Sequence, residues 1–556
     1  MGIRSAYAHR VTVAVSLILA MAAAVAAEPA APAAEQRFDV MEYRVIGNTV
    51  LAGRDIERLL YPLLGTRKTL QDVEAARTAL EGLYHDKGYG TVFVDIPPQT
   101  VNGGLVRLRV TEGRVERERI SGARFFPERD VLAALPAAQP GTVLHLSELQ
   151  QQLTALNAAT PDRSVVPILK AGSAPGTVDL SLQVNDKLPV HGSLEINNQS
   201  SLDTHELRSV ASVSYGNVFG HLDSLSLQYQ GTPQQFDQVR VFAANYQWHA
   251  LDSGLQPSLQ YVNSNSNVAV IGTLGVLGIG EITSLHFAYP LLSEPANQQS
   301  LTFGVDYKHF RNLINENSTT RSDDTPITYL NLSFAYAGLW RTDQLTTTLS
   351  LSANAGPRGI VGKQADFAND RALARDNYFY LRGDLALNFS LPADFGLRLR
   401  AAGQGTAEPL ITNENDSIAG VDGVRGYLES EVLGDQTLKE TAQLTTPVWR
   451  NHDHALADGF LFFDAGRTWI RDSLDEIDPS HAPHCESSGT GLHLRSWGTG
   501  FDVLPGQKVT GSFTWARALD SATDLPDVFV AGGCPASGPA TRAGQNRWLF
   551  LLRGSF

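Results

Sequence analysis

The segment Gly423-Val424-Arg425-Gly426-Tyr427 places a single cation between two glycines in a polar, glycine-rich part of the chain. Glycine allows a sharp turn and close approach to other groups, so the segment could hold one long cationic side chain at a loop tip. A guanidinium can bind a carboxylate through two parallel hydrogen bonds. A surface turn with a solvated arginine is the alternative, because most polar glycine-containing segments are turns.

A carboxylate that could serve such a cation lies in the segment FLFFDAGR, which begins at Phe460. Strand alternation divides this segment into two faces, one with Phe460, Phe462, Asp464 and Gly466 and one with Leu461, Phe463 and Ala465. A carboxylate is costly against lipid. If this strand crosses a membrane, we therefore expect Asp464 to face the interior.

Other candidate groups lack a supporting motif. The run GTLGVLGIG from Gly272 has the glycine spacing of a nucleotide loop, but no helix and no phosphate-binding lysine follow it. Two groups could ligate a metal, His452 with His454 in an expected turn, and His481 with His484 and Cys485. No nucleophile–base arrangement has a motif such as G-x-S-x-G. We expect no enzyme activity, no cofactor and no metal site.

The N-terminus carries the features of a secretory signal. Arg4 and Arg10 precede an apolar run, and small residues end it at Ala27. A membrane anchor is the alternative, but the alanine-rich segment EPAAPAAEQR that follows argues against it. We predict a signal peptide at 1–27 and a linker at 28–37, with the mature chain entering the periplasm.

Composition excludes several classes. No later stretch has the ~18 to 20 continuous apolar residues of a transmembrane helix, and the mean hydropathy is −0.13. A soluble multidomain protein and an outer-membrane β-barrel both fit these values, because a barrel strand needs only alternate apolar residues. Two cysteines exclude a disulfide scaffold, and a net charge of −14 argues against nucleic-acid binding.

Two units with the order β-α-α-β-β follow the linker in tandem, over 38–113 and 114–187, and form an internal repeat. Such a unit leaves a sheet edge open, and an open edge can pair with an extended visiting chain. The segment GTVDLSLQVND of the second unit alternates through Val178, Leu180, Leu182 and Val184. We predict that a visiting chain pairs along this segment. Two structural spacers without a ligand are the alternative.

From about residue 188 to 556, helical periodicity gives way to two-residue alternation, as in DSLSLQYQG and SLTFGVDYKHF. Connectors alternate between short ones such as LPADFG and long ones such as 408–437. These features predict a transmembrane antiparallel β-barrel of about 16 strands, with short periplasmic turns and long external loops. A soluble β-sandwich also alternates, but its chain seldom runs this long as one domain.

The order of a signal peptide, two such repeats and a barrel with VRGY in a long loop resembles the two-partner secretion transporters, the TpsB family of ShlB, FhaC and HecB type. Their superfamily includes the barrel assembly factor BamA. The segments VTEGRV, YGNVFG and FAYPLL, and the F-x-F-D-x-G pattern ending at Gly466, add to the resemblance. It implies two α+β POTRA domains followed by the barrel.

The resemblance also implies a site and a function. The VRGY loop would fold into the lumen, Arg425 would pair with Asp464 as a latch, Gly423 and Gly426 would permit the tip, and Tyr427 would pack against the wall. The chain would be an outer-membrane pore that captures an unfolded TpsA-type exoprotein through its POTRA domains and exports it. Lipid and the barrel-assembly machinery would be further partners. A barrel-assembly factor and a passive porin are the alternatives.

Two further expectations concern the plugging of the pore and the two cysteines. Many family members carry a plug helix before the first POTRA domain, but the linker here is too short to cross the lumen, so the long loop would do most of the plugging. Cys485 and Cys534 fall in neighbouring long loops on the predicted outside. In an oxidising compartment they would form a disulfide if their Cα atoms come within about 7 Å. Two free thiols, or metal binding together with His481 and His484, are the alternatives.

Overall fold

The structure is a computed structural model. It describes residues 36–202, 204–249, 251, 253–266, 268–271, 274–315, 322–371, 373–451, 454–471, 492–503, 508–522 and 541–556. The predicted signal peptide, most of the linker, Cys485, Cys534 and the histidine groups at 452 and 481–484 lie outside these residues, so their predictions stay predictions. The chain divides into two compact units, residues 1–119 with 135–152 and 167–181, and residues 120–134 with 153–166 and 182–556.

The first repeat contains eight elements: β1 (Phe38–Val40), β2 (Glu42–Ile46), α1 (Gly53–Leu60), η1 (Tyr61–Leu63), β3 (Gly65–Lys68), α2 (Leu70–Asp86), β4 (Phe93–Asp95) and β5 (Leu105–Thr111). Strand β5 lies in the centre of a sheet with the order β2-β5-β4, and β1 pairs with β3. Helix α2 begins where Thr69 and Asp72 form a capping box, and ends just before Gly88, whose φ is +92°. Its buried side chains, Val73, Ala76, Leu80 and Tyr84, belong to the core of this repeat.

The second repeat has the same order without counterparts of β1 and β3: β6 (Arg114–Ser121), α3 (Glu128–Ala133), η2 (Pro136–Ala138), α4 (Leu146–Ala158), β7 (Arg163–Ala171) and β8 (Thr177–Asp186). Its sheet has the order β6-β8-β7, so in both repeats the central strand of the three-stranded sheet is the last strand of that repeat in chain order. The internal repeat seen in the sequence therefore corresponds to a repeated strand order.

The predicted edge at Val178, Leu180, Leu182 and Val184 is wrong. These residues lie in β8, which has a neighbour on both sides and offers no free ladder of hydrogen bonds. Leu180, Leu182 and Val184 are buried. Alternation marked a strand with one apolar face, but it could not tell whether that strand was central. The free edges of this sheet belong to β6 and β7.

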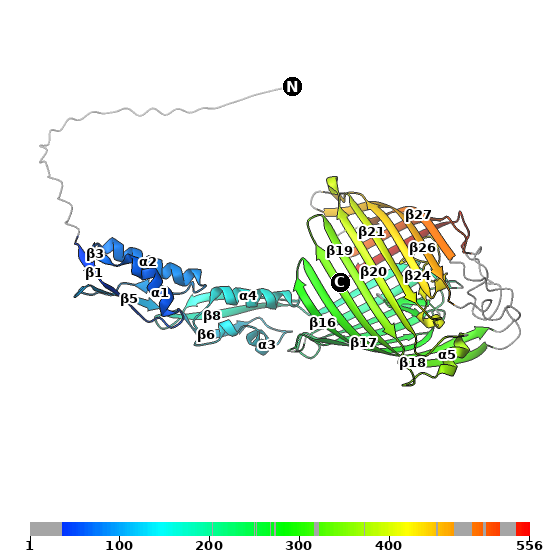
Figure 1. Cartoon of the computed structure of the whole chain (residues 1–556), viewed down its shortest axis with the longest axis horizontal. Coiled ribbons are helices and arrows are strands. Elements are labelled where there is room, and N and C mark those ends of the chain that lie inside the picture. The colour runs from blue at the N-terminus through cyan, green and yellow to red at the C-terminus, as the bar shows by residue number, and fades with distance from the viewer. Residues whose placement is uncertain are drawn as a thin grey trace, which may run out of the picture. The chain divides into compact units, whose positions relative to one another are not determined.

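The rest of the chain forms a closed barrel in which sixteen strands of 8 to 20 residues are described. They are β9 (Val190–Asn197), β10 (Arg208–Gly216), β11 (Ser224–Gly231), β12 (Arg240–Gln247), β13 (Gln256–Ser264), β16 (Ile279–Glu294), β17 (Asn297–Asn315), β18 (Ser322–Arg341), β19 (Leu345–Ala355), β20 (Phe379–Ser390), β21 (Gly396–Thr406), β24 (Gln436–Thr445), β26 (His454–Trp469), β27 (Leu492–Val503), β28 (Val509–Ala518) and β29 (Asn546–Ser555). Each pairs antiparallel with its neighbours, and β29 pairs with β9 to close the barrel. The predicted fold class is confirmed (Figure 1).

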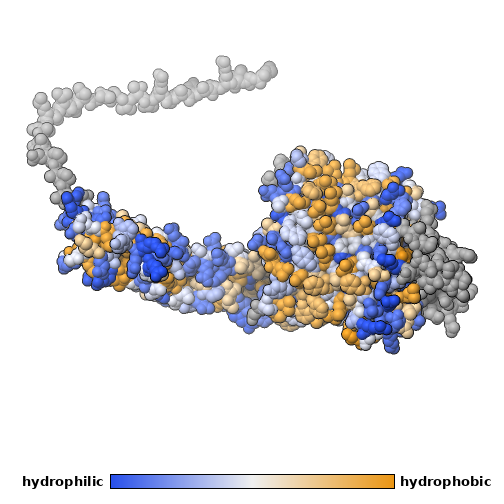
Figure 2. All heavy atoms as spheres, viewed as in Figure 1, coloured by the Kyte–Doolittle hydropathy of each residue, from blue (hydrophilic) through white to orange (hydrophobic). Residues whose placement is uncertain are grey.

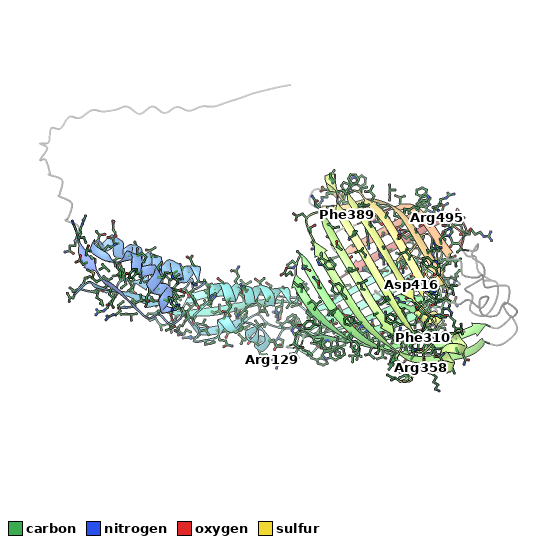
Figure 3. All side chains as sticks on the ribbon, in the orientation of Figure 1. Arg129, Phe310, Arg358, Phe389, Asp416 and Arg495 are labelled. Atoms are coloured by element: carbon green, nitrogen blue, oxygen red, sulfur yellow. The ribbon has the colours of Figure 1, made fainter. Side chains whose placement is uncertain are left out.

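Short elements occupy the connections: β14 (Val268–Ile271) with β15 (Leu274–Leu277), α5 (Gln364–Asp370), η3 (Pro392–Asp394), η4 (Thr412–Glu414), β22 (Asp416–Ser417), β23 (Leu433–Gly434) and β25 (Trp449–Asn451). Short turns and long loops occur at opposite ends of the barrel. Figure 3 labels Phe389 near a short turn and Arg358 in the long loop that carries α5. None of the described helices is long and apolar enough to span a membrane.

The outward face of the barrel is apolar because alternate residues of each strand point away from the lumen. Exposed large side chains occur on strand after strand, among them Leu194, Phe242, Phe303, Phe334, Leu385, Phe463, Trp497 and Phe513. Figure 2 shows hydrophobic residues gathered over the barrel strands. Inward residues of the strands include polar side chains such as Asn331, Gln404 and Asp464, beside apolar ones such as Phe310 and Leu494.

One carboxylate breaks this outward pattern. Glu440 is the fifth of the ten residues of β24, is exposed, and shares the outward face with Leu438 and Leu444. It lines an apolar groove of about 340 Å³ with Leu399, Phe463 and other residues. No hydrogen bond or ion pair joins it to another residue in the described parts of the chain. A carboxylate near the middle of a lipid-facing strand is destabilising.

We expect Glu440→Leu to stabilise the barrel by up to about 2 kcal/mol, because the substitution removes a charge from the lipid-facing band. The urea midpoint of unfolding in lipid vesicles measures this. Glu294→Leu is the control, since Glu294 lies at the end of β16 beside a turn. A lower midpoint for Glu440→Leu would show that the carboxylate has a stabilising partner in the membrane.

Candidate functional site

The segment between β21 and β24, residues 407–435, folds against the inner wall of the barrel and is called here the lumen loop. Ile418, Val424, Tyr427 and Val432 of this loop are buried in one apolar cluster with Leu492, Leu494 and Ala518 of the wall and with Ala522, which follows β28. Burial of these side chains favours the inward position of the loop. The predicted tip, from Gly423 to Tyr427, is therefore inside the barrel and is not a surface turn.

At the tip, Arg425 contacts Asp464 of β26 through three hydrogen bonds. The Nε and Nη2 groups of Arg425 donate to the two carboxylate oxygens, over 2.8 and 2.9 Å, and its backbone N–H donates over 3.1 Å. The carboxylate is fully buried. The Nη1 group donates to Oε1 of Gln443 over 2.9 Å. The guanidinium thus bridges β24 and β26 and uses the bidentate geometry for which arginine is suited.

Phe462 supports the arginine from the wall. The guanidinium carbon of Arg425 lies 3.5 Å from the centre of the Phe462 ring, a close cation–π contact. Space for the ring comes from the next strand, because a Cβ at Gly498 would lie 2.5 Å from the Phe462 ring. Gly466 plays a similar part toward the loop, since a Cβ there would lie 2.8 Å from Val424.

The two glycines at the tip have separate structural reasons. Gly426 has a φ of +99°, a backbone angle that residues with a Cβ rarely adopt. A Cβ at Gly423 would lie 2.3 Å from the carbonyl oxygen of Ile418. Tyr427 is buried, and its hydroxyl donates to the carbonyl of Asp520 over 2.7 Å. These contacts attach the tip to the end of β28.

The base of the lumen loop is anchored by Glu414. Its carboxylate accepts hydrogen bonds from Lys308 over 2.6 Å, from Tyr380 over 2.7 Å and from Tyr329. Burial raises the pKa of Glu414, but Lys308 and the two phenols outweigh it, so the pKa lies below its ordinary value. The anchor is therefore a carboxylate with its charge compensated.

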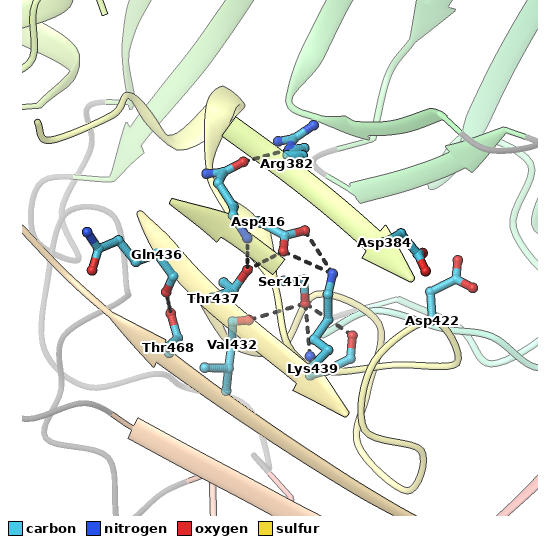
Figure 4. A network of polar contacts seen from close by, with 12 residues as sticks. Arg382, Asp384, Asp416, Ser417, Asp422, Val432, Gln436, Thr437, Lys439 and Thr468 are labelled. Atoms are coloured by element: carbon cyan, nitrogen blue, oxygen red, sulfur yellow. Dashed lines mark hydrogen bonds and ion pairs between the residues drawn. The ribbon is translucent and has the colours of Figure 1, made fainter. Parts of the chain in front are cut away.

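Two more carboxylates fix the lumen loop near its two ends. Asp416 pairs with Lys439 over 2.9 Å and accepts a hydrogen bond from Thr437, as Figure 4 shows. Asp435, fully buried, accepts two hydrogen bonds from Arg371, which follows α5. Sequence reasoning missed Glu414, Asp416 and Asp435. The only signal was the acidic residues on both sides of VRGY, and nothing local indicated their partners.

The loop also contacts both strands that close the barrel. The backbone N–H of Glu429 donates to the carbonyl of Ser200, just after β9, over 3.0 Å. The carboxylate of Glu431 accepts hydrogen bonds from Thr541, just before β29. Strands β9 and β29 pair over only five residues, Ser193–Asn197 with Leu551–Ser555. The loop thus supports the closure that has the fewest paired residues among the sixteen described strands.

Two family models match the chain. The ShlB-type POTRA domain matches residues 38–113, and the haemolysin secretion/activation protein ShlB/FhaC/HecB matches residues 176–492. Among curated sequences, the outer membrane transporter CdiB of Dickeya dadantii is 27% identical over 186 residues, 34% of this chain and 32% of CdiB. This chain thus spans about a third of the length of the CdiB sequences that it matches. The heme/hemopexin transporter HuxB of Haemophilus influenzae is 20% identical, over 89% of this chain and 86% of HuxB.

Solved structures show the same fold. CdiB from Escherichia coli has a TM-score of 0.54 at 18% identity and covers 96% of this chain and 93% of its own. BamA from Haemophilus ducreyi, lacking POTRA domains 1–3, has a TM-score of 0.58 at 13% identity and covers 93% of this chain and 100% of its own. At such identities the likeness concerns the fold.

Proposed function

The chain belongs to the family of haemolysin secretion/activation proteins ShlB/FhaC/HecB, and on that premise we propose that it is an outer-membrane pore that exports an unfolded partner protein. The partner is a TpsA-type exoprotein, received in the periplasm by the two POTRA domains and passed through the barrel to the cell surface. The observation that carries this proposal is a lumen loop held inside a closed barrel by Arg425 and Asp464.

The Arg425–Asp464 pair acts as a latch in this proposal. Its carboxylate is buried, so release of the arginine would leave an uncompensated charge. The loop therefore has one well-defined closed position. An arriving polypeptide must displace the loop from this position to widen the lumen. The chain contains no nucleotide motif, and export draws on folding of the partner outside the cell.

We place periplasmic capture on β7, the edge strand of the second repeat, in place of β8. The side chains of Val166, Ile168 and Leu169 in β7 are 46%, 39% and 40% exposed, which is unusual for large apolar residues on one strand. Pro167 is compatible with an edge position, because it lacks a backbone N–H. An unfolded chain can add to such an edge through backbone hydrogen bonds, with little demand on its sequence.

The test first asks whether a gene beside that of this chain encodes a large exoprotein, and then compares cells that express this exoprotein with and without the chain. We expect the exoprotein at the surface or in the medium only when the chain is present, with other outer-membrane barrels unchanged. Depletion of those barrels would favour a barrel-assembly factor. Exoprotein retained in the periplasm of cells that gain uptake of small solutes would favour a passive porin.

In the same cells, photo-crosslinking residues at positions 166 and 168 are expected to capture the exoprotein during export. Position 61 is the matched control, because Tyr61 is exposed and belongs to η1 of the first repeat, not to this sheet. Capture from lumen positions but not from 166 or 168 would assign β7 a purely structural role. This outcome would leave the export function intact.

A further inference from the structure

Two cavities of the barrel share the same three lining residues. The larger has a volume of about 1220 Å³, the smaller about 290 Å³, and Arg398, Arg400 and Asp422 line both. The smaller cavity is also lined by Arg425 of the latch and by Leu549 to Leu551 of β29. A residue that lines two cavities stands where they meet. The three residues therefore mark a junction between the wall at β21 and the tip of the lumen loop.

Arg400 bridges this junction. Its guanidinium donates to both carboxylate oxygens of Asp384 on β20, the shortest contact being 2.6 Å. Its Nη1 group donates to the main-chain carbonyl of Asp422 in the loop over 3.0 Å. Figure 4 shows Asp384 and Asp422 on the strand and the loop that Arg400 joins. Arg400 of the wall thus already binds one main-chain carbonyl of a segment that is neither helix nor strand, the carbonyl of Asp422 in the lumen loop.

Arg398 differs from the other lumen arginines. It lies two residues before Arg400 on the same face of β21, opposite Asn388 on β20 and Gln443 on β24. In the described parts of the chain it has no hydrogen bond or ion pair to any residue, whereas Arg382, Arg400 and Arg425 are all engaged. A guanidinium with free donors beside another cation attracts an anion or a carbonyl.

We propose that Arg398 and Arg400 form a binding site in the lumen for the carboxylates and main-chain carbonyls of an extended, acidic polypeptide. The site rests on the proposed export function and names a chemistry for the passing chain at the loop tip. A carboxylate first binds the free guanidinium of Arg398. A carbonyl of the same chain then replaces that of Asp422 on Arg400. This exchange removes one contact between the lumen loop and the wall, so binding favours displacement of the loop.

The test measures binding of a fluorescent polyglutamate peptide to the purified full-length protein in nanodiscs, by anisotropy. Polyglutamine and polylysine peptides of equal length are the comparisons. We expect polyglutamate to bind most tightly, more weakly as salt rises, and about tenfold more weakly to Arg398→Gln. Arg398→Lys keeps part of the affinity because it keeps the charge. Arg358→Gln, in the loop that carries α5, is the matched control and leaves affinity unchanged.

Equal polyglutamate affinity of the wild type and Arg398→Gln would overturn the site, as would equal binding of polylysine. Displacement of the peptide by free phosphate, at a phosphate concentration equal to that of the glutamate side chains, would overturn the assignment of the site to a polypeptide. A heat-shift gel shows whether each variant barrel is folded. If the Arg398→Gln barrel does not fold, Arg398→Lys tests the same position. Peptide binding requires no export, so a failed secretion assay bears on the proposed function alone.

Discussion

Arg425→Ala is expected to reduce export strongly while the barrel still assembles at its normal level. The substitution removes the two hydrogen bonds that the Arg425 side chain donates to Asp464 and its contact with the Phe462 ring, and it leaves a fully buried carboxylate without its cation. Breaking a buried pair from one side costs about 3–5 kcal/mol. That cost falls on docking of the lumen loop, because the strands keep their own hydrogen bonds.

The measurement is the amount of exoprotein outside the cell relative to the amount of folded barrel in the outer membrane. Asp464→Ala should have the same effect. The double variant Arg425→Asp with Asp464→Arg, which swaps the two charges, should restore part of the export. Arg358→Ala is the control, since Arg358 is exposed and far along the chain from the latch. Full export by both single variants, at normal barrel levels, would refute the latch.

Gly498→Ala is expected to weaken the latch without changing any of its groups. A Cβ at Gly498 would lie 2.5 Å from the ring of Phe462 and 2.1 Å from the carbonyl oxygen of Trp515. Both distances are too short, so the ring must move, and the guanidinium of Arg425 rests on that ring. Overpacking of this kind costs about 1–3 kcal/mol. Export should fall, and the lumen loop should become more sensitive to protease.

The matched control is Gly405→Ala, which introduces the same methyl group on a barrel strand. A Cβ at Gly405 would have no neighbour within 4 Å, so export and protease sensitivity should stay unchanged. If Gly498→Ala behaves like Gly405→Ala, the ring of Phe462 does not position the arginine. If both variants lose export, the effect comes from strand glycines in general and not from the latch.

The sequence by itself determined the class of each element. Two-residue alternation predicted the barrel strands, and helical periodicity predicted the helices of the two repeats, because both patterns depend on which face of a local segment is buried. The tandem order of strands and helices predicted two α+β repeats. The glycines at 423 and 426 indicated a tight tip, and strand alternation with the cost of a carboxylate against lipid placed Asp464 on the inward face of β26.

Strand order and long-range partners were decided only by the tertiary structure. The alternation in β8 was recognised, but its central position depends on β6 and β7, whose pairing is non-local. The partners of Glu414, Asp416 and Asp435 come from distant strands and from the residue after α5, brought together when the barrel closes. Arg398 and Arg400 look alike in the sequence. Only the fold gives Arg400 a carboxylate and a carbonyl and leaves Arg398 without a hydrogen bond or ion pair among the described residues, because hydrogen-bond satisfaction depends on where other segments lie.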